Sequence, residues 1–303
     1  MTNIRSQIST IQSQLEAVYP EDEARALAWW MMEEMTGLSR TQLQFGCKDT
    51  TFSPYMQEKL RENISRLLHF EPIQYIFGHT LWNGLDLKVN PATLIPRPET
   101  ADLIEQISNL NSQISILKSP FRVLDIGTGS GCIAIALKKA HPEWQVTGMD
   151  ISAEAIEVAR ENAQRNGVEV NFIQADIFSD ELIEPFSGGE IGGIEHFDIV
   201  VSNPPYICES EKKNMRPNVL EFEPATALFV PDSDPLRFYR RIAELFALPL
   251  QGKGRERGYL FFEINEAYAA EMEHLLLQNG YTDIHITRDI YGKQRIIEGK
   301  IVK

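Results

Sequence analysis

Apolar and polar segments alternate along most of the chain in a way that predicts a parallel β-sheet. Seven short apolar runs of strand length follow residue 120, and segments with apolar residues at helical spacing separate most of them. This alternation predicts a largely parallel sheet with helices on both faces. The predicted strands are 121–126, 144–150, 169–175, 197–202, 258–264, 281–287 and 294–302, and the predicted helices are 98–108, 131–140, 153–166, 234–247 and 266–278.

The last two predicted strands form a reversed pair. Only residues 288–293 connect them, which is too short for the crossover that parallel strands need. We therefore expect them to pair antiparallel at one edge of the sheet.

The N-terminal segment has a different pattern and predicts a bundle of helices. Ser53 followed by Pro54 suits the N-cap and first turn of one of them. A β-hairpin is expected after the bundle, because apolar and polar residues alternate around Asn83-Gly84. The three helical segments are 4–18, 21–35 and 53–70.

These patterns divide the chain into a helical domain (1–72), a β-hairpin linker (73–96) and an α/β domain (97–303). The helical domain is too small to be a catalytic unit, which favours a role in recognising a partner. Packing against the α/β domain is the alternative. The Trp29-Trp30 pair fits a core position better than a binding surface.

Composition is that of a globular protein, with 43% hydrophobic and 24% charged residues. The three cysteines lack Cys-x-x-Cys spacing, which favours reduced thiols in a cytoplasmic protein and no metal site. No segment has the apolar length of a signal peptide core or a membrane span. The net charge of −14 opposes binding to a phosphate backbone, although an acidic surface that only aids solubility is equally consistent.

The stretch Asn203-Pro204-Pro205-Tyr206 follows a predicted buried strand, and its two prolines must end that strand. The residue before each proline is also held extended. The resulting stiff turn leaves the Asn203 amide and the Pro204 carbonyl free for a ligand. Together these groups suit a planar -NH2 group, whose two hydrogens need two acceptors. An ordinary proline-rich turn is the plain alternative.

A second signal is the run Asp125-Ile-Gly127-Thr128-Gly129-Ser130-Gly131, which joins a strand to a helix. Glycines at such a turn allow a ligand to approach the backbone closely, although a tight turn alone would also use them. The spacing differs from Gly-x-Gly-x-x-Gly, and no Gly-Lys-Ser/Thr phosphate loop is present.

Two acids extend this signal, because Asp150 ends one predicted strand and Asp176 follows the next. Asp150 lies about 20 residues past the glycines, the spacing of a ribose-binding carboxylate. Either acid alone would suit a helix N-cap. The ordered set favours a ligand site at the carboxyl edge of the sheet.

Taken in order, these motifs resemble class I S-adenosylmethionine-dependent methyltransferases, and the Asn-Pro-Pro-Tyr turn resembles the branch that methylates planar nitrogens. Three further runs make nearly the whole chain similar to the PrmC (HemK) family, the peptide chain release factor N(5)-glutamine methyltransferases. These runs are Pro72-Ile-Gln-Tyr-Ile-Phe-Gly78, Leu94-Ile-Pro-Arg97-Pro-Glu99-Thr100 and Glu223-Pro-Ala-Thr-Ala-Leu228.

The resemblance implies a Rossmann-like, seven-stranded methyltransferase sheet with an N-terminal helical bundle and a hairpin linker. It implies transfer of a methyl group from S-adenosylmethionine, leaving S-adenosylhomocysteine, to the glutamine of the Gly-Gly-Gln loop in release factors 1 and 2. We expect a cytoplasmic monomer that binds neither membrane nor nucleic acid directly.

The resemblance also assigns roles to residues. Asn203, Pro204, Pro205 and Tyr206 would be catalytic and bind the substrate, with the Asn203 oxygen and the Pro204 carbonyl accepting its two amide hydrogens. Arg97 and Glu99 would line the mouth of the site or hold the linker by an ion pair. The cofactor residues would be Gly127, Thr128, Gly129, Ser130, Gly131, Asp150, Asp176, Ile177 and Asn203, with Asp150 on the ribose and Asp176 and Ile177 at the adenine.

Three alternatives remain open at this point. An N(6)-adenine methyltransferase of DNA or RNA shares the Asn-Pro-Pro-Tyr turn, but lacks this helical N-terminus and would need a basic groove. A non-enzymatic S-adenosylmethionine-binding module would not need Asn203. A ribosomal-protein glutamine methyltransferase is the nearest competitor. The chain departs from the family pattern at Ala101, at 229–232 and in an enlarged loop at 187–193.

Overall fold

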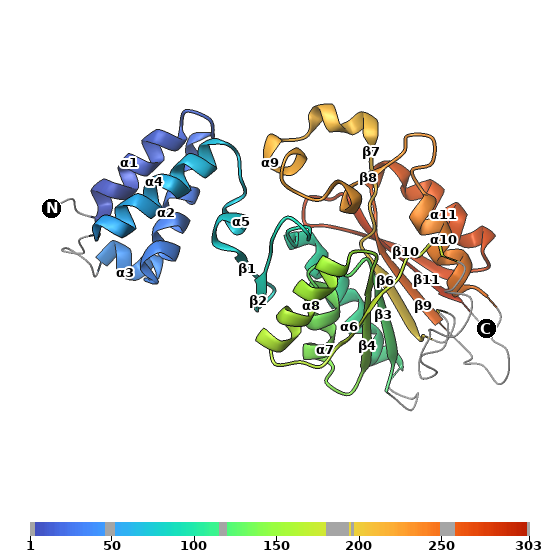
Figure 1. Ribbon diagram of the computed structural model, residues 1–303. Coiled ribbons are helices and arrows are strands. Elements are labelled where there is room, and N and C mark those ends of the chain that lie inside the picture. The colour runs from blue at the N-terminus through green and yellow to red at the C-terminus, as the bar shows by residue number, and fades with distance from the viewer. Residues whose placement is uncertain are drawn as a thin grey trace. The chain divides into compact units, whose positions relative to one another are not determined.

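The structure is a computed structural model, and it describes residues 4–45, 52–114, 120–179, 194, 197–248 and 258–301. The chain forms two compact units (Figure 1). The first comprises Met1–Gly78 and Arg216–Phe222, and the second comprises His79–Met215 and Glu223–Lys303. The enlarged loop predicted at 187–193 lies outside the described residues. No helix among those described is long and apolar enough to cross a membrane.

The first unit is helical, as its sequence pattern predicts. Ile4, Ile8, Ile11 and Leu15 form a stripe along one face of the first helix and are buried, as the spacing of three and four residues requires. Ser53 caps α4, where its side chain accepts a hydrogen bond from the Met56 amide. The helices are α1 (Ile4–Leu15), α2 (Glu21–Thr36), α3 (Arg40–Phe45), α4 (Pro54–Leu68), α5 (Ile73–Phe77) and α9 (Pro217–Leu220).

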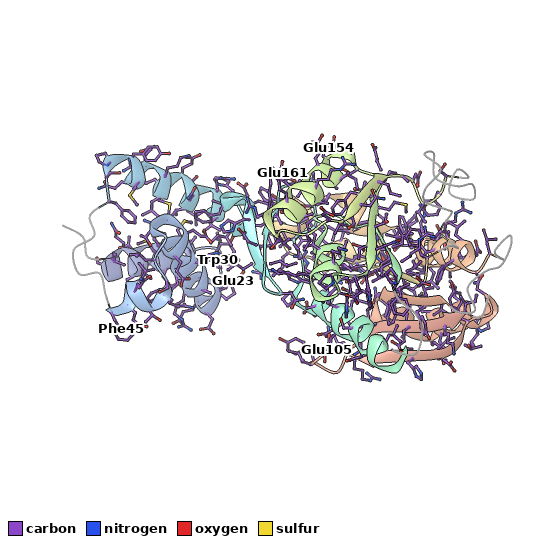
Figure 2. All side chains as sticks on the ribbon, turned by 90° about the horizontal axis from the view of Figure 1, so that it is seen from below. Glu23, Trp30, Phe45, Glu105, Glu154 and Glu161 are labelled. Carbon is purple, nitrogen blue, oxygen red and sulfur yellow. The ribbon has the colours of Figure 1, made fainter. Side chains whose placement is uncertain are left out.

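Several details of this unit differ from the sequence pattern. Ile73–Phe77 is a helix rather than the start of the hairpin, because Pro72 precedes its first turn and Gly78, at φ 75°, ends it in the left-handed conformation. Helices α3 and α9 are too short for periodicity to predict. Trp29 and Trp30 are half-buried against the core, whereas Phe45 is exposed (Figure 2).

The second unit begins with the hairpin, which is shorter than the predicted 73–96. Strands β1 (His79–Trp82) and β2 (Leu85–Lys88) pair antiparallel around the Asn83-Gly84 turn. Leu87 of β2 and Trp82 of β1 are buried in the core under α6, α7 and α8. The hairpin is therefore part of this unit and not a separate linker.

A seven-stranded sheet forms the centre of the second unit, in the spatial order β10-β11-β9-β6-β3-β4-β5. The five strands β9, β6, β3, β4 and β5 run parallel, whereas β11 is antiparallel to both of its neighbours, as predicted for the last strand. The strands are β3 (Arg122–Ile126), β4 (Gln145–Asp150), β5 (Asn171–Gln174), β6 (Ile199–Ser202), β9 (Gly258–Glu263), β10 (Thr282–Arg288) and β11 (Gln294–Ile301).

Helices cover both faces of this sheet, so the unit has three layers (Figure 1). Val123 of β3 faces the core beneath α6, α7 and α8, whereas its neighbour Leu124 faces the core beneath α10 and α11. Glu154 and Glu161 project from the outer side of α8 (Figure 2). The helices are α6 (Ala101–Ile114), α7 (Cys132–Ala140), α8 (Ala153–Arg165), α10 (Arg237–Phe246) and α11 (Ala269–Gln278).

Candidate functional site

A cavity of about 430 Å³ opens at the carboxyl ends of the parallel strands. This edge is where open α/β sheets bind their ligands. The cavity brings together predicted site residues from four separate stretches of the chain. They are Gly127, Gly129, Asp150, Asp176, Ile177, Asn203, Pro204 and Pro205.

The glycine turn after β3 forms one wall. Gly129 has φ 54°, and a side chain added to it would meet only open space and the Gly127 carbonyl, 4.0 Å away. At Gly131, also in the left-handed region, an added Cβ would lie 3.1 Å from the Cβ of Ala159 in α8. The first position therefore leaves the backbone open to a ligand, and the second allows close helix packing.

The other residues of this turn do not line the cavity. The buried Thr128 hydroxyl donates a 2.6 Å hydrogen bond to the Asp125 carboxylate. Ser130 is buried, and Gly131 stands at the N-terminus of α7. Thr128, Ser130 and Gly131, which the sequence predicts in the cofactor site, therefore shape the turn but do not line the cavity.

Asp125 ties the turn to helix α7. Its Oδ2 accepts hydrogen bonds from Thr128 and from the Ala134 amide, whereas its buried Oδ1 has no hydrogen-bond partner among the described residues. Burial raises the pKa of this carboxyl to about 7, although the two hydrogen bonds lower it.

Asp150 ends β4 at the opposite side of the turn. Its Oδ2 accepts from the Gly129 amide at 2.8 Å and its Oδ1 from the Ser152 amide at 3.0 Å. Burial raises the pKa of Asp150, and these backbone hydrogen bonds oppose the rise. A carboxylate has about four acceptor positions, so Asp150 keeps lone pairs for the hydroxyl groups of a ligand.

Asp176 and Ile177 follow β5 at the far end of the cavity. The Asp176 Oδ1 accepts from the Phe178 amide at 2.9 Å, and the Ile177 carbonyl accepts from Arg241 Nε at 3.0 Å. Ile177 is buried and contributes an apolar surface. A flat, apolar ring with a polar edge fits this end.

An aromatic cluster that the sequence pattern does not predict lies beside Asp176. The Arg237 guanidinium lies 4.5 Å from the ring centre of Phe178 and 5.4 Å from that of Phe238, and all three residues line the cavity. The two rings are 5.2 Å apart. Arg237 and Phe238 belong to α10, whose pattern indicates only an amphipathic helix, so no signal was available for them.

The Asn203 turn forms another wall of the cavity. It follows β6, which is anchored to β3 by a 2.7 Å hydrogen bond from the Ser202 hydroxyl to the Ile126 carbonyl. Asn203 Nδ2 donates to Thr100 Oγ1 at 3.3 Å, and the Thr100 hydroxyl donates to Glu263 at 2.7 Å. The Asn203 amide is therefore held from behind by two buried side chains.

Tyr206 does not line the cofactor-sized cavity. Its hydroxyl donates to the buried Glu263 at 3.2 Å. Burial, and to a smaller extent the nearby Glu263 carboxylate, raise the pKa of this phenol. The ring borders a separate recess of about 290 Å³. The other residues of this recess are Ile207, Glu211, Asn214, Met215, Asn265, Glu266, Lys293 and Arg295.

Arg97 forms an ion pair, but not with Glu99. Its guanidinium donates to the buried Glu223 at 2.7 Å, and Glu223 also accepts from the Ile95 amide at 3.2 Å. This contact joins the Pro96-Arg97-Pro98 segment to the loop that carries Thr226. Thr226 and Ala227 from one side, with Ala92, Thr93 and Leu94 from the other, line the cavity.

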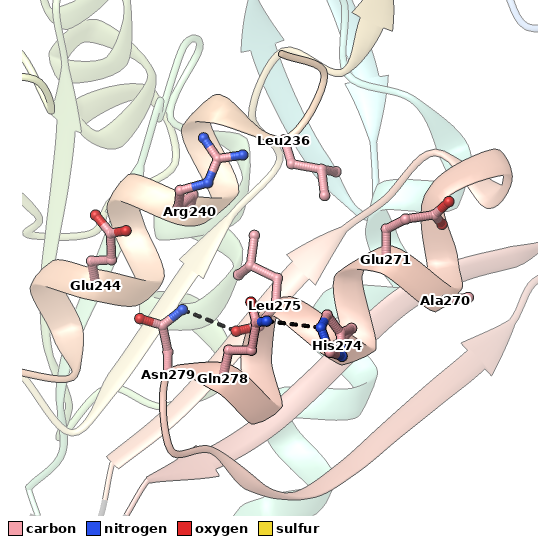
Figure 3. A pocket seen from close by; sticks show the side chains of 9 residues that line it. All are labelled: Leu236, Arg240, Glu244, Ala270, Glu271, His274, Leu275, Gln278 and Asn279. Carbon is pink, nitrogen blue, oxygen red and sulfur yellow. Dashed lines mark hydrogen bonds between the residues drawn. The ribbon is translucent and has the colours of Figure 1, made fainter. Parts of the chain in front are cut away.

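A second cavity, of about 520 Å³, lies between α10 and α11 (Figure 3). Arg240 and Glu244 border it from α10, and His274 and Gln278, which are hydrogen-bonded at 2.8 Å, border it from α11. It contains none of the predicted site residues. Across the described ranges, no group of three or more histidine, cysteine or acidic residues is placed to hold a metal ion.

The cavity at the strand ends fits a nucleoside-containing cofactor. Open space over Gly129 admits the ligand to the backbone, Asp150 offers lone pairs to ribose hydroxyls, and the Phe178 surface suits a base. A volume of about 430 Å³ is in the range of small-molecule sites.

Comparisons with known families cover both units. Residues 8–78 match the family described as the PrmC N-terminal domain, and residues 117–242 match the family described as a methyltransferase domain.

Individual relatives match over nearly their whole length. The release factor glutamine methyltransferase of Bacteroides thetaiotaomicron is 44% identical over 95% of this chain and 96% of that protein. The protein of the same name from Flavobacterium psychrophilum is 39% identical over 94% of each chain.

Among solved structures, the hMettl16 catalytic domain in complex with the MAT2A 3′UTR hairpin 1 aligns with a TM-score of 0.54. The alignment covers 96% of this chain and 91% of that one at 16% sequence identity, so the likeness is one of fold alone.

Proposed function

The chain belongs to the release factor glutamine methyltransferase family. We propose that it methylates the side-chain amide nitrogen of a glutamine in peptide chain release factors. S-adenosylmethionine is the proposed methyl donor. The observation that carries the proposal is the Asn203 turn, which borders the cavity of Gly129 and Asp150. The amide proposed to bind the substrate nitrogen thus borders the proposed cofactor site.

The substrate sets the chemical problem. An amide nitrogen is a poor nucleophile because its lone pair is delocalised into the carbonyl group. Asn203 Oδ1 and the Pro204 carbonyl would accept its two hydrogens, which turns the nitrogen toward the methyl donor and favours the pyramidal geometry of the transition state. Pro205 keeps the turn rigid.

S-adenosylmethionine, when bound, supplies a methyl group on a positively charged sulfur. A nitrogen–carbon bond forms as the sulfur–carbon bond breaks, the electron pair of that bond stays on sulfur, and one amide proton leaves to solvent. The residues of this chain bind and orient the two reactants and stabilise the positive charge that develops on the nitrogen.

For the cofactor, we propose that the 127–131 turn holds the methionine and ribose portion, with Asp150 accepting from the ribose hydroxyls. Asp176 would bind the adenine amino group, and Ile177 and Phe178 would pack against the ring. Arg237, stacked on Phe178, would hold that ring in place.

For the protein substrate, we propose release factors 1 and 2, with the glutamine of their Gly-Gly-Gln loop as the acceptor. The recess beside Tyr206 would admit this loop, since it shares the Asn203–Tyr206 turn with the cofactor cavity. The helical unit would recognise the rest of the release factor. We propose that the enzyme works as a monomer in the cytoplasm, where translation ends.

The experiment follows radiolabelled methyl from S-adenosylmethionine to a purified release factor. The same factor with its Gly-Gly-Gln glutamine replaced, a ribosomal protein and duplex DNA serve as alternative acceptors. We expect label on the intact release factor alone. Label on DNA or on the ribosomal protein instead would overturn the assignment of the substrate.

The Asn203→Ala variant tests the proposed mechanism. We expect turnover to fall by ~10²–10³, as when one preorganised polar group is removed from an active site. Asn171→Ala is a matched control, because Asn171 is exposed at the start of β5, at the other edge of the sheet. Near-normal turnover in a folded Asn203→Ala protein would remove Asn203 from the mechanism.

A further inference from the structure

A chain of hydrogen bonds lies behind the Asn203 turn. It runs from Asn203 Nδ2 to Thr100 Oγ1 (3.3 Å), from the Thr100 hydroxyl to Glu263 Oε2 (2.7 Å), and from the Tyr206 hydroxyl to Glu263 Oε1 (3.2 Å). Thr100 and Glu263 are each 2% exposed. Neither borders the cavity.

The topology explains why these side chains meet. Glu263 is the last residue of β9, which lies next to β6 with Ser202 paired to Phe262. Asn203 follows Ser202, so the two side chains lie at the same level of neighbouring strands. Thr100 closes the short 3₁₀ turn Pro98–Thr100, which leads from the proline-framed segment into α6.

The direction of these hydrogen bonds decides which way the Asn203 amide faces. An ionised carboxylate accepts hydrogen bonds but donates none. Glu263 therefore takes the single hydroxyl hydrogen of Thr100, and Thr100 Oγ1 is left with lone pairs only. It must then accept from Asn203, so Nδ2 faces Thr100 and Oδ1 is left for a ligand. Among the described residues, no group donates to that oxygen.

The second carboxylate oxygen acts on the other end of the turn. Because Tyr206 donates to Glu263, one buried residue holds both Asn203, through Thr100, and Tyr206 directly. Burial raises the pKa of Glu263, and the hydrogen bonds from Thr100 and Tyr206, together with the Arg295 guanidinium on β11, oppose that rise and favour the ionised carboxylate.

We propose that Glu263 and Thr100 are positioning residues, which set the Asn203 amide so that its oxygen faces the substrate nitrogen. This inference rests on the proposed function of Asn203. Without these hydrogen bonds, the Asn203 amide would be free to turn and present Nδ2, a donor, to the substrate -NH2 group, which is also a donor. The effect should fall on turnover and leave cofactor binding unchanged.

The first test compares Thr100→Val with Thr100→Ser. Valine keeps the shape but lacks the hydroxyl, and we expect kcat to fall about 10-fold to 10²-fold, since small misplacements of reacting groups cost up to that factor. The Kd for S-adenosylmethionine and the KM for the release factor should stay within about threefold of wild type, because the orientation of the Asn203 amide affects the chemical step and not binding. Serine restores the hydroxyl and should restore at least half of kcat.

Thr147→Val is the matched control, because Thr147 is a buried threonine of β4 that does not line the cavity. A Thr100→Val protein with kcat within twofold of wild type would overturn the proposal. If Thr100→Val does not fold, a folded Thr100→Ser protein with kcat reduced tenfold or more would overturn it.

A double-mutant cycle separates positioning from a structural role. If Thr100 acts through Asn203, Thr100→Val should have no further effect in an Asn203→Ala background. Equal losses in both backgrounds would mean that Thr100 supports the fold and not the amide.

A measurement without substrate keeps this inference separate from the proposed function. The side-chain amide hydrogens of Asn203, identified by their loss in Asn203→Ala, should exchange slowly in wild type and faster in Thr100→Val. Unchanged exchange would overturn the inference even if release factors are methylated. Protected hydrogens in an enzyme that leaves release factors unlabelled would instead overturn the proposed substrate.

Discussion

The buried carboxyl of Asp125 should make the second unit less stable as the pH rises. Burial raises the pKa of this group from 3.8 to about 7. A group whose pKa is raised by folding holds its proton more tightly in the folded state. The folded state is therefore favoured below pH 3.8, and this advantage is lost as the pH rises to about 7.

The magnitude follows from the size of the shift. A rise from 3.8 to about 7 is about three pKa units, and at about 1.36 kcal/mol for each unit it corresponds to ~4 kcal/mol. Of this, about 2.5 kcal/mol is lost between about pH 5 and pH 8, because the unfolded carboxyl is already ionised and the folded one is not.

Asp125→Asn removes this dependence on pH. The asparagine Oδ1 can still accept from Thr128 and Ala134, while its Nδ2 takes the place of the carboxylate oxygen that lacks a partner. Burying that amide costs ~1–3 kcal/mol at every pH. The stability of the variant relative to wild type should therefore improve by about 2.5 kcal/mol from about pH 5 to pH 8.

The assay is unfolding by urea and by calorimetry at several pH values, without cofactor. Other ionisable groups are common to both proteins, so the difference between the two curves isolates Asp125. Asp283→Asn, which changes an exposed carboxylate of the same unit, is the control and should run parallel to wild type. Parallel curves for Asp125→Asn and wild type, within about 0.5 kcal/mol, would refute the reasoning.

Two further outcomes are expected. Asp150→Ala should raise the Kd for S-adenosylmethionine about 10-fold to 10²-fold in titration calorimetry, because hydrogen bonds to a charged group contribute ~1.5–3 kcal/mol each; an unchanged Kd would count against Asp150 as the ribose ligand. Glu223→Gln should lower the free energy of unfolding of the second unit by ~1–3 kcal/mol in urea, because it leaves the Arg97 guanidinium and the Ile95 amide with a weaker acceptor; an unchanged midpoint would mean that this contact contributes little.

The architecture could be predicted because local pattern and fold agree. All seven predicted strands are present, and each end lies within two residues of its predicted position, since buried strands need apolar runs and turns need glycine or proline. The reversed pair β10–β11 followed from the length of its connection alone. Where pattern and structure differ, as at Ile73–Phe77, the element is a single helical turn with too few residues for any periodicity.

The site was predictable only in part, because some of its residues carry no local signal. The glycine turn and Asn203 follow strands directly and Asp150 ends one, so all three could be placed at one edge of the sheet. Glu263, in contrast, ends an ordinary apolar strand, and Thr100 lies 163 residues before it. Phe238 appears as one more apolar position of an amphipathic helix. Contacts between distant segments depend on the packed fold, which short patterns do not specify.

Asp125 and Glu263 are both exceptions to the rule that buried positions of a strand are apolar. Each is a nearly or fully buried carboxyl on a strand of the sheet, each has a pKa raised by burial, and neither lines the cavity. Burying an ionised carboxylate disfavours folding, so a core built for stability alone would have apolar residues there. Both instead hold a turn that does line the cavity: Asp125 holds the glycine turn through Thr128, and Glu263 holds the Asn203 turn through Thr100. The two buried carboxyls thus lie behind the two walls that we propose to hold the cofactor and the substrate amide, where precise geometry matters more than stability.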